Sequence, residues 1–350
     1  MLIITLLICS AGILQIYSAT HDTPAWEDAW WKQMIWIGGG ILLMWIVSQI
    51  DYHTLMGQVP ILYAMTVGLL AVTFVIGKMV FGSRRWIGYG SAHLQVSEFC
   101  KIVIVLLVAR YLSEQKADEL EGRELLKLAG LIAIPWVLVF RQPDLGTSLT
   151  YLPVLAVGVF LAGIRWKYLA VVGLALALTI PIGWQFLKDY QKARLETFVD
   201  PAKDPKGSGY QVIQSRIAVG QGGMWGRGVT RGTQTQLRFL PVPHTDFIFS
   251  AFAEEHGFVG VIVVLGLYFL LLMQIVQNAQ LAPDRAGLYI CMGISAMLLF
   301  HVLVNVGMVV GRMPVTGIPL PLMSAGGSNI LSMFMMLGLV NNVRLRRFVN

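Results

Sequence analysis

The sequence predicts an all-α, polytopic membrane protein with about ten transmembrane helices and one large extracytoplasmic loop. Of its 350 residues, 56% are apolar and only 13% are charged, against roughly 25% charged residues in an ordinary soluble domain. The mean hydropathy is +0.68, and apolar segments are spread over the whole chain. This composition excludes a soluble globular protein, a disordered chain and a disulfide scaffold.

Ten apolar segments come close to the ~20 residues that a membrane-crossing helix needs. The first is expected to be a retained span, because no basic segment precedes it as in a cleavable signal peptide. The expected spans are Met1–Ser18, Gln33–Ile50, Leu62–Phe81, Phe99–Leu112, Leu126–Phe140, Ser148–Gly163, Tyr168–Phe186, Phe247–Val276, Gly287–Val310 and Ile330–Val343.

An even number of spans places both termini on the same side of the membrane. Arg344, Arg346 and Arg347 follow the last span, and the positive-inside rule assigns such clusters to the cytoplasm. We therefore expect a single integral membrane domain over residues 1–350, with both termini in the cytoplasm. Residues 188–246 would then form the large extracytoplasmic loop between the seventh and eighth spans.

This loop carries much of the positive charge of the chain. The 26 Lys and Arg residues exceed the 19 Asp and Glu residues by 7, and nine of the basic residues lie between Lys188 and Arg238. One explanation is a solvated loop surface. The other is an anionic ligand at the outer leaflet, such as a lipid phosphate or pyrophosphate, which Arg and Lys would neutralise.

Two local patterns stand out within the loop. Ile213 and Ile217 are four residues apart, which indicates a short amphipathic helix over Tyr210–Val219 that lies at the membrane interface. Five glycines follow between Gly220 and Gly228, and they allow unusual backbone conformations. They predict either a flexible turn or a nest of backbone amides that binds an anion.

A first polar cluster precedes the fourth span. It contains Arg85 in the segment 84–88 and then Glu98 and Lys101 at the start of the span. Glu98 and Lys101 are three residues apart, so on a helix they share a face and can form an ion pair. The pair is either a structural anchor or part of the charged lining of a cavity, since ionisable groups within a membrane are costly.

A second cluster, residues 141–148, joins the fifth and sixth spans. Pro143 and Gly146 predict a turn, in which Asp144 or Thr147 would cap the next helix. Asp144 would alternatively bind a metal or steer a basic partner.

The third cluster, residues 240–249, leads from the long loop into the eighth span and contains His244, Thr245 and Asp246. Glu254 would lie about 12 Å along the helix axis from Asp246, farther than the roughly 5–9.5 Å between the two carboxylates of a glycosidase. If Asp246 takes part in chemistry, it therefore acts as a lone base, assisted by His244 or a metal.

The fourth cluster comprises Asn305–Met308 and then residues 312–329, in which Pro314, Pro319 and Pro321 prevent a regular helix. We expect a re-entrant or extended loop buried in protein. It is either a structural plug or the lining of a groove for an apolar ligand, with Ser324, Ser328 and glycines that admit close approach.

Four motifs in this order on about ten spans resemble the SEDS family of bacterial cell-wall polymerases. Residues Gly232–Pro241 are more similar to the rod-elongation branch of that family than to its division branch. The motifs are Gln142–Thr147, Gly209–Ser215, His244–Phe249 and Pro314–Pro321. Two positions depart from the family pattern, Val96 in place of Pro and Ala325 in place of Tyr.

The resemblance implies an inverting peptidoglycan glycosyltransferase in the bacterial cytoplasmic (inner) membrane, which polymerises lipid II at the outer face during cell elongation. Asp246 would be the catalytic base that deprotonates the 4-hydroxyl of the acceptor sugar, while lipid pyrophosphate leaves. The charge of the leaving group would be stabilised by a divalent metal, Mg²⁺ or Mn²⁺, or by basic side chains. The basic candidates are Arg85, Lys101, Arg194, Arg216 and Arg227.

The same resemblance implies further lining residues and partners. The lining residues would be Glu98, Lys101, Asp144, His244, Thr245, Ser324 and Ser328. The expected partners are a class B penicillin-binding protein, which supplies the transpeptidase, and other membrane proteins of the elongation complex; no nucleic acid is expected. Two alternatives remain open, a lipid II flippase and a non-enzymatic scaffold for the transpeptidase.

Overall fold

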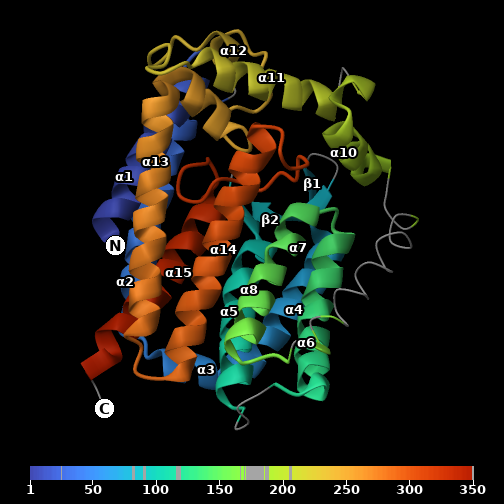
Figure 1. Ribbon diagram of the computed structural model, residues 1–350, viewed down its shortest axis with the longest axis vertical. Helices are drawn as coiled ribbons and strands as arrows, with labels where there is room; N and C mark the ends of the chain where they lie inside the picture. Colours follow the sequence, from blue (N-terminus) through green and yellow to red (C-terminus); the bar gives the residue numbers. More distant parts are fainter. Residues whose placement is uncertain are drawn as a thin grey trace. The chain divides into compact units, whose positions relative to one another are not determined.

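The computed structural model describes residues 1–24, 26–80, 83–89, 92–115, 120–165, 167–168, 170, 185, 189–204 and 207–348. Within these ranges the fold is helical apart from one small sheet (Figure 1). Its helices are α1 (Leu2–Thr20), α2 (Ala29–Gln49), α3 (Tyr52–Gly57), α4 (Val59–Ile76), α5 (Val96–Ser113), α6 (Gly122–Arg141), α7 (Leu145–Leu149), α8 (Tyr151–Leu161), α10 (Asp189–Val199), α11 (Ser208–Gln221), α12 (Thr233–Gln236), α13 (Ile248–Gln280), α14 (Arg285–Val309) and α15 (Gly327–Leu345), with short 3₁₀ turns at Pro201–Lys203 and Arg346–Phe348.

The predicted spans correspond to these helices wherever the structure describes them, except at the end of the third. That span was expected to run to Phe81, but α4 ends at Ile76, and after Gly77 residues Lys78–Val80 form a short strand. The sixth span corresponds to α7 and α8 together, and the seventh, Tyr168–Phe186, lies almost wholly outside the described residues. In the described part of the chain, α1, α4, α13 and α14 are long and apolar enough to cross a membrane. The chain is a polytopic, all-α membrane protein, as the composition predicted.

The chain divides into two compact units, which we describe separately. Unit 1 comprises Met1–Gln33, Arg165–Leu270 and His301–Ala325, and unit 2 comprises Met34–Ile164, Leu271–Phe300 and Gly326–Asn350. The single membrane domain over residues 1–350 and the extracytoplasmic position of residues 188–246 stay predictions.

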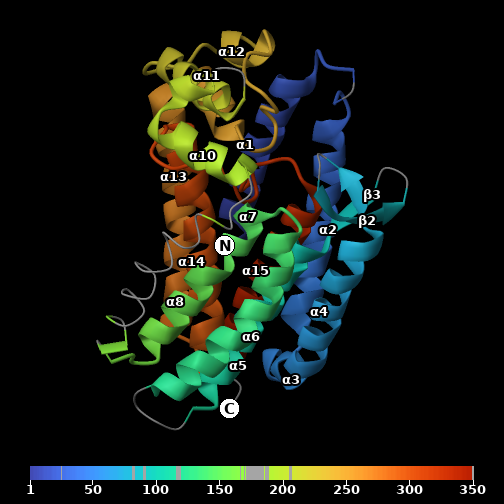
Figure 2. The same cartoon turned by 90° about the vertical axis from the view of Figure 1, so that its right-hand side faces the viewer.

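The core of unit 2 is built around α5, which packs against α4, α6, α8 and α15 (Figure 2). Its side chains from Ile102 to Ala109 are all buried. A helix that is apolar on every side is stable only when protein or lipid surrounds it. Because α5 also begins with Glu98 and Lys101, this packing carries two charged groups into the interior of the unit.

A three-stranded antiparallel sheet precedes α5 and was not expected from the sequence. Its strands are β1 (Lys78–Val80), β2 (Ser83–Tyr89) and β3 (Ala92–Gln95), in the order β1-β2-β3. β2 also contacts α4. Because β3 runs directly into α5, the sheet positions the Arg85 and Gln95 side chains near the start of that helix.

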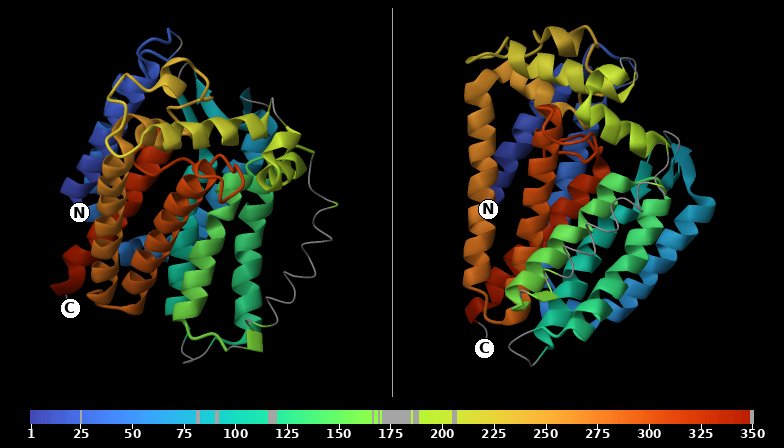
Figure 3. Two further views of the ribbon diagram at one scale, coloured as in Figure 1. Left: turned by 45° about the horizontal axis from the view of Figure 1, so that its top comes forward. Right: turned by 45° about the vertical axis from the view of Figure 1, so that its right-hand side comes forward.

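In unit 1, α11 packs against α10 and α12 and runs crosswise to the start of α13 (Figure 3). The amphipathic helix expected over Tyr210–Val219 is confirmed as α11, and Ile213 and Ile217 are 37% and 39% exposed on it. Its position at a membrane interface stays a prediction.

The glycine-rich segment after α11 is a docked loop rather than a flexible turn. Gly257 has φ 65° and ψ −168°, which kinks α13 and releases its backbone groups there. The segment pairs with them, since Phe258 N–H donates to the Gly223 carbonyl at 2.8 Å and Gly228 N–H donates to the Glu255 carbonyl at 3.0 Å. Because Gly228 N–H binds a protein carbonyl, it is not available to an anion.

We predict that Gly226→Ala destabilises the protein, whereas Gly220→Ala does not. Gly226 has φ +81°, and a Cβ there would collide with the Glu255 carbonyl, a strain of about 1–3 kcal/mol. Gly220 lies inside α11 with open space around it, so alanine there would favour the helix. Thermal unfolding in detergent measures both; equal melting temperatures for the two variants would contradict the docked loop.

Candidate functional site

The motif around Asp246 is held by backbone contacts from the end of the proline-rich segment. Ser324 Oγ donates to the Thr245 carbonyl at 2.8 Å, and Ala325 N–H donates to the His244 carbonyl at 2.9 Å. Because Ser324 is fully buried and its hydroxyl binds the backbone of the motif, we interpret it as a residue that positions the motif. Ala325 makes this contact with its backbone N–H. The contact therefore does not require the tyrosine side chain that the family pattern has at this position.

Asp246 itself lies two residues before the start of α13 and is half-buried. Asn305, on α14, donates from Nδ2 to the Asp246 carbonyl at 3.0 Å and to the Ile318 carbonyl at 2.8 Å. Gly317 has φ +73°, and a Cβ built on it would lie 3.4 Å from Asp246 Oδ2. The segment that contains Pro314–Pro321 therefore lies directly beside the Asp246 carboxylate, and it is the buried, non-helical loop that the sequence predicted.

His244 is buried against Trp26, with 4.6 Å between the ring centroids. Burial lowers the pKa of His244 to about 4, so its imidazole is neutral near pH 7. Its Nε2 finds no hydrogen-bond partner among the residues that the structure describes. His244 therefore supplies no positive charge at neutral pH.

Glu254 and Glu255, which follow Asp246 in the sequence, are fully occupied with structural contacts. Glu254 accepts hydrogen bonds from Gln234 N–H at 2.7 Å and from Thr235 Oγ at 2.9 Å. Glu255 accepts one from Ser18 Oγ at 2.6 Å. These carboxylates attach α12 and α1 to α13, so neither is available as a partner of Asp246 in catalysis.

The three arginines expected to bind an anion in unit 1 lie on the α10–α12 segment and its glycine loop. Arg194 is on α10, whereas Arg216 on α11 and Arg227 after it are exposed. Arg227 Nε donates to the Gln221 carbonyl at 3.1 Å. The exposed guanidinium groups can therefore meet an anionic group without the cost of burying a charge.

In unit 2, Glu98 and Lys101 form the ion pair that their spacing predicted. Lys101 Nζ lies 2.7 Å from Glu98 Oε2, and the two side chains are 0% and 5% exposed. Ser332 Oγ donates to the same carboxylate oxygen at 3.2 Å. Such a pair is stable in the interior only because each charge neutralises the other.

Asp144 has two roles, because it caps a helix and forms an ion pair. It accepts from Thr147 N–H at 3.2 Å at the start of α7, which confirms the predicted cap. Arg85 Nη1 lies 3.2 Å from its Oδ1, and Gln95 Nε2 donates to its Oδ2 at 2.7 Å. Ser328 Oγ accepts from Gln95 N–H at 3.0 Å, so this serine also belongs to the polar cluster of unit 2.

The described residues contain no group of three or more His, Cys, Asp or Glu side chains that could hold a metal ion. The donor set therefore does not fit a metal held by the protein alone within those ranges.

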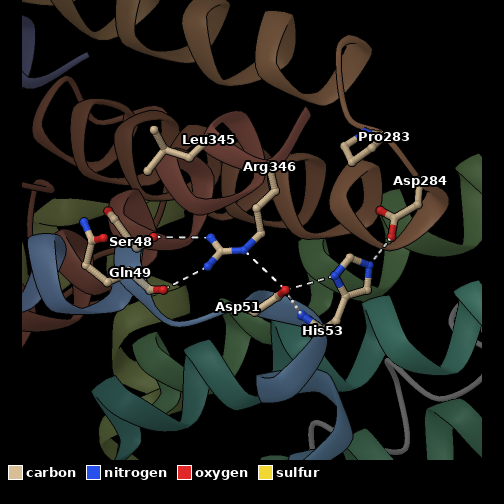
Figure 4. Close-up of a pocket in the computed structure, with 8 residues that line it drawn as sticks. All are labelled: Ser48, Gln49, Asp51, His53, Pro283, Asp284, Leu345 and Arg346. Carbon is tan, nitrogen blue, oxygen red and sulfur yellow. Dashed lines mark hydrogen bonds and ion pairs between the residues drawn. The ribbon is translucent and has the colours of Figure 1, made fainter. Parts of the chain in front are cut away.

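Unit 2 also contains a pocket of about 620 Å³ that the sequence did not indicate (Figure 4). His53 Nδ1 lies 3.0 Å from Asp51 and its Nε2 lies 2.7 Å from Asp284. Arg346 Nε lies 3.4 Å from Asp51, and its other nitrogens donate to the carbonyls of Ser48 and Gln49. These polar groups bind one another and so connect three segments of the unit, residues 48–53, 283–284 and 345–346. We call this set of contacts the His53 clasp.

Residues 1–347 match the model of a family that comprises FtsW, RodA and SpoVE and is described as "Cell cycle protein". The chain belongs to the FtsW/RodA/SpoVE family. It is 38% identical to the peptidoglycan glycosyltransferase MrdB of Escherichia coli K12, over 99% of this chain and 93% of that protein. This membership confirms the resemblance that the four motifs indicated.

Two solved structures of the family extend the match to the fold. One chain, from work on the "structural coordination of polymerization and crosslinking by a peptidoglycan synthase complex", has a TM-score of 0.86 and 35% identity and covers 100% of this chain and 98% of that chain. The rod-shape-determining protein RodA of Thermus thermophilus has a TM-score of 0.74 and 30% identity, with 100% and 97% covered.

We predict that breaking the buried Glu98–Lys101 pair destabilises this FtsW/RodA/SpoVE family member more than removing the whole pair does. Lys101→Met leaves a buried carboxylate without its cation, at a cost of about 3–5 kcal/mol, whereas Glu98→Gln with Lys101→Met removes both charges. Thermal unfolding of both single variants and the double variant measures the coupling between the two sites.

The matched control for this cycle is Lys127→Met, because Lys127 and Glu124 have the same three-residue spacing in an exposed ion pair. We expect it to change stability by less than about 1 kcal/mol. Additive effects of the two buried substitutions would contradict the pairing.

We predict that the His53 clasp stabilises the protein most between about pH 4 and pH 6.5. Partial burial alone would lower the pKa of His53, but hydrogen bonds to Asp284 and Asp51 outweigh it and raise this pKa. The pKa of Asp51 is lowered, because hydrogen bonds from His53 and the charge of Arg346 outweigh its slight burial. The contribution of His53 is thus complete below its unfolded pKa and is lost as the pH rises through its folded pKa, whereas that of Asp51 is lost at acidic pH.

Melting temperatures between pH 4 and pH 9 for the wild type and for His53→Gln measure this effect. The stability difference between the two proteins should shrink toward alkaline pH. A difference that does not vary with pH would show that His53 is not protonated in the clasp.

Proposed function

We propose that this chain is a peptidoglycan glycosyltransferase that polymerises lipid II into glycan strands at the outer face of the cytoplasmic membrane during cell elongation. The observation that carries the proposal is the match over residues 1–347 to a family whose relatives include named peptidoglycan glycosyltransferases. Both termini would lie in the cytoplasm, in accordance with the arginines after the last span.

Asp246 is proposed as the catalytic base. Its carboxylate would accept the proton of the 4-hydroxyl of the acceptor sugar as that oxygen attacks the anomeric carbon of the growing chain. The bond from the anomeric carbon to the lipid pyrophosphate breaks on the opposite side, which inverts the configuration, and the pyrophosphate leaves with the bonding electrons. The half-buried position of Asp246 on a backbone held by three hydrogen bonds supports this role, because a general base must be held close to its proton.

The pyrophosphate carries concentrated negative charge, which cationic groups must stabilise. Arg216 and Arg227 are suited to this task because their guanidinium groups are exposed; Arg194 and Arg85 are further candidates. Lys101 is neutralised by Glu98, so we assign the pair to shaping the interior of unit 2. A divalent metal, Mg²⁺ or Mn²⁺, would supply further positive charge, although the described residues do not hold one by themselves.

A class B penicillin-binding protein is proposed as the partner that cross-links the strands, together with other membrane proteins of the elongation complex. The similarity to a chain from a complex that coordinates polymerisation and crosslinking supports this proposal.

We predict that the purified protein, combined with a partner whose transpeptidase site is blocked, converts labelled lipid II into glycan strands. Asp246→Asn should lower the polymerisation rate by about 100-fold or more, because the amide cannot accept the proton. Asp28→Asn is the control, since Asp28 is exposed and paired only at 4.0 Å with Lys32; it should polymerise at the wild-type rate.

The same assay separates the alternatives. Wild-type polymerisation by Asp246→Asn would overturn the assignment of the base. Movement of labelled lipid II across vesicles without any polymer would identify a flippase, and neither activity alongside binding of the transpeptidase would identify a scaffold.

A further inference from the structure

Asn305 is a buried amide in the apolar helix α14, and its orientation is determined by its partners. The residue is 0% exposed. Its Nδ2 donates to the carbonyls of Asp246 and Ile318 at 3.0 and 2.8 Å. Because both partners are acceptors, the nitrogen must face them and Oδ1 must face away. That oxygen is buried without a hydrogen-bond partner within the described ranges.

The two carbonyls that Asn305 binds belong to Asp246 itself and to the segment beside its carboxylate. One is the carbonyl of Asp246 itself, and the other belongs to Ile318, the neighbour of Gly317. Gly317 flanks Asp246 Oδ2, since a Cβ there would lie 3.4 Å from that oxygen. A single side chain from α14 therefore sets the spacing between Asp246 and the backbone beside its carboxylate.

We propose that Asn305 is a positioning residue that holds Asp246 in the geometry required of a general base. The proposal rests on the proposed glycosyltransferase function. A base must lie about 2.6–3.2 Å from the atom whose proton it takes, and a misplacement of about 1 Å can lower a rate about 100-fold. Asn305 donates one hydrogen bond to the backbone of Asp246 and one to the backbone of Ile318, next to Gly317. These two bonds keep such a misplacement from occurring.

The chain contains a matched control in unit 2. Asn342 on α15 is also 0% exposed, and its Nδ2 donates to the carbonyls of Val47, at 2.6 Å, and Ile50. It makes the same kind of bridge between two carbonyls among residues that take no part in the proposed chemistry. Loss of either amide should lower the stability, but only loss of Asn305 should change the catalytic step.

The experiment measures kcat and KM for labelled lipid II, normalised to folded protein, together with the melting temperature. Asn305→Ala should lower kcat by about 10–100-fold with KM within about threefold of the wild type. Asn342→Ala should lower the melting temperature while kcat per folded molecule stays at the wild-type value. If Asn305→Ala does not fold, Asn305→Ser, which keeps one donor, should give an intermediate kcat.

A pH–rate profile of Asn305→Asp adds a readout that loss of stability would not move. A carboxyl group buried against two carbonyl oxygens is driven to its neutral form, which keeps a single donor, and wherever it ionises, its negative charge favours the protonated form of Asp246. The acid limb of the kcat profile should therefore shift to higher pH relative to the wild type. A kcat of Asn305→Ala and Asn305→Ser within threefold of the wild type would overturn the positioning role.

Asp246→Asn, measured in parallel, separates this failure from failure of the proposed function. An inactive Asp246→Asn together with active Asn305 variants overturns the positioning role alone. A fully active Asp246→Asn overturns the base assignment and the positioning role together.

Discussion

Polar groups inside a membrane protein depend on hydrogen-bond partners within the protein, and the buried carboxylates Glu98, Asp144 and Glu254 follow that constraint. Glu98 is neutralised by Lys101, Asp144 is shared between Arg85 and the start of α7, and Glu254 accepts hydrogen bonds from α12. The contacts of Arg85 with Asp144 and of Gln234 and Thr235 with Glu254 join segments that are separate in the sequence. The cost of an unpaired polar group therefore determines how loops and helices are attached within each unit.

The same constraint produces the proposed site. Asp246 lies where a loop becomes a helix, and its backbone is held by Asn305 while Ser324 holds its neighbour Thr245. The proline-rich segment cannot form a helix, so its carbonyls accept hydrogen bonds from side chains of other elements, such as Asn305 on α14 and Tyr268 on α13. The groups that satisfy it also hold the carboxylate beside Gly317. The hydrogen bonds of Asn305 thus have two effects: they support an irregular, buried backbone, and they position the proposed base.

Most of the elements and the position of the candidate base could be predicted from the sequence. The helices follow from apolar segments of membrane-spanning length, and the Glu98–Lys101 pair follows from a spacing of three residues on one helix. The small sheet before α5 was missed because its strands are short and carry no strong alternation of apolar and polar residues. The amide of Asn305 was visible as a polar residue in an apolar span, but its two acceptors, 59 and 13 residues away, were not.

The sequence by itself determined that this is a polytopic helical protein of the FtsW/RodA/SpoVE family and that Asp246 lies in its most informative motif, because composition and motif spacing are local properties of the chain. Only the tertiary structure decided how the ambiguous polar residues are used. It assigned Glu254 and Glu255 to attaching α12 and α1, the glycines to a docked loop at the kink of α13, and Asn305 to the backbone of Asp246. Hydrogen bonds between segments that are distant in sequence depend on where the fold brings their backbones, and no local pattern of residues encodes that.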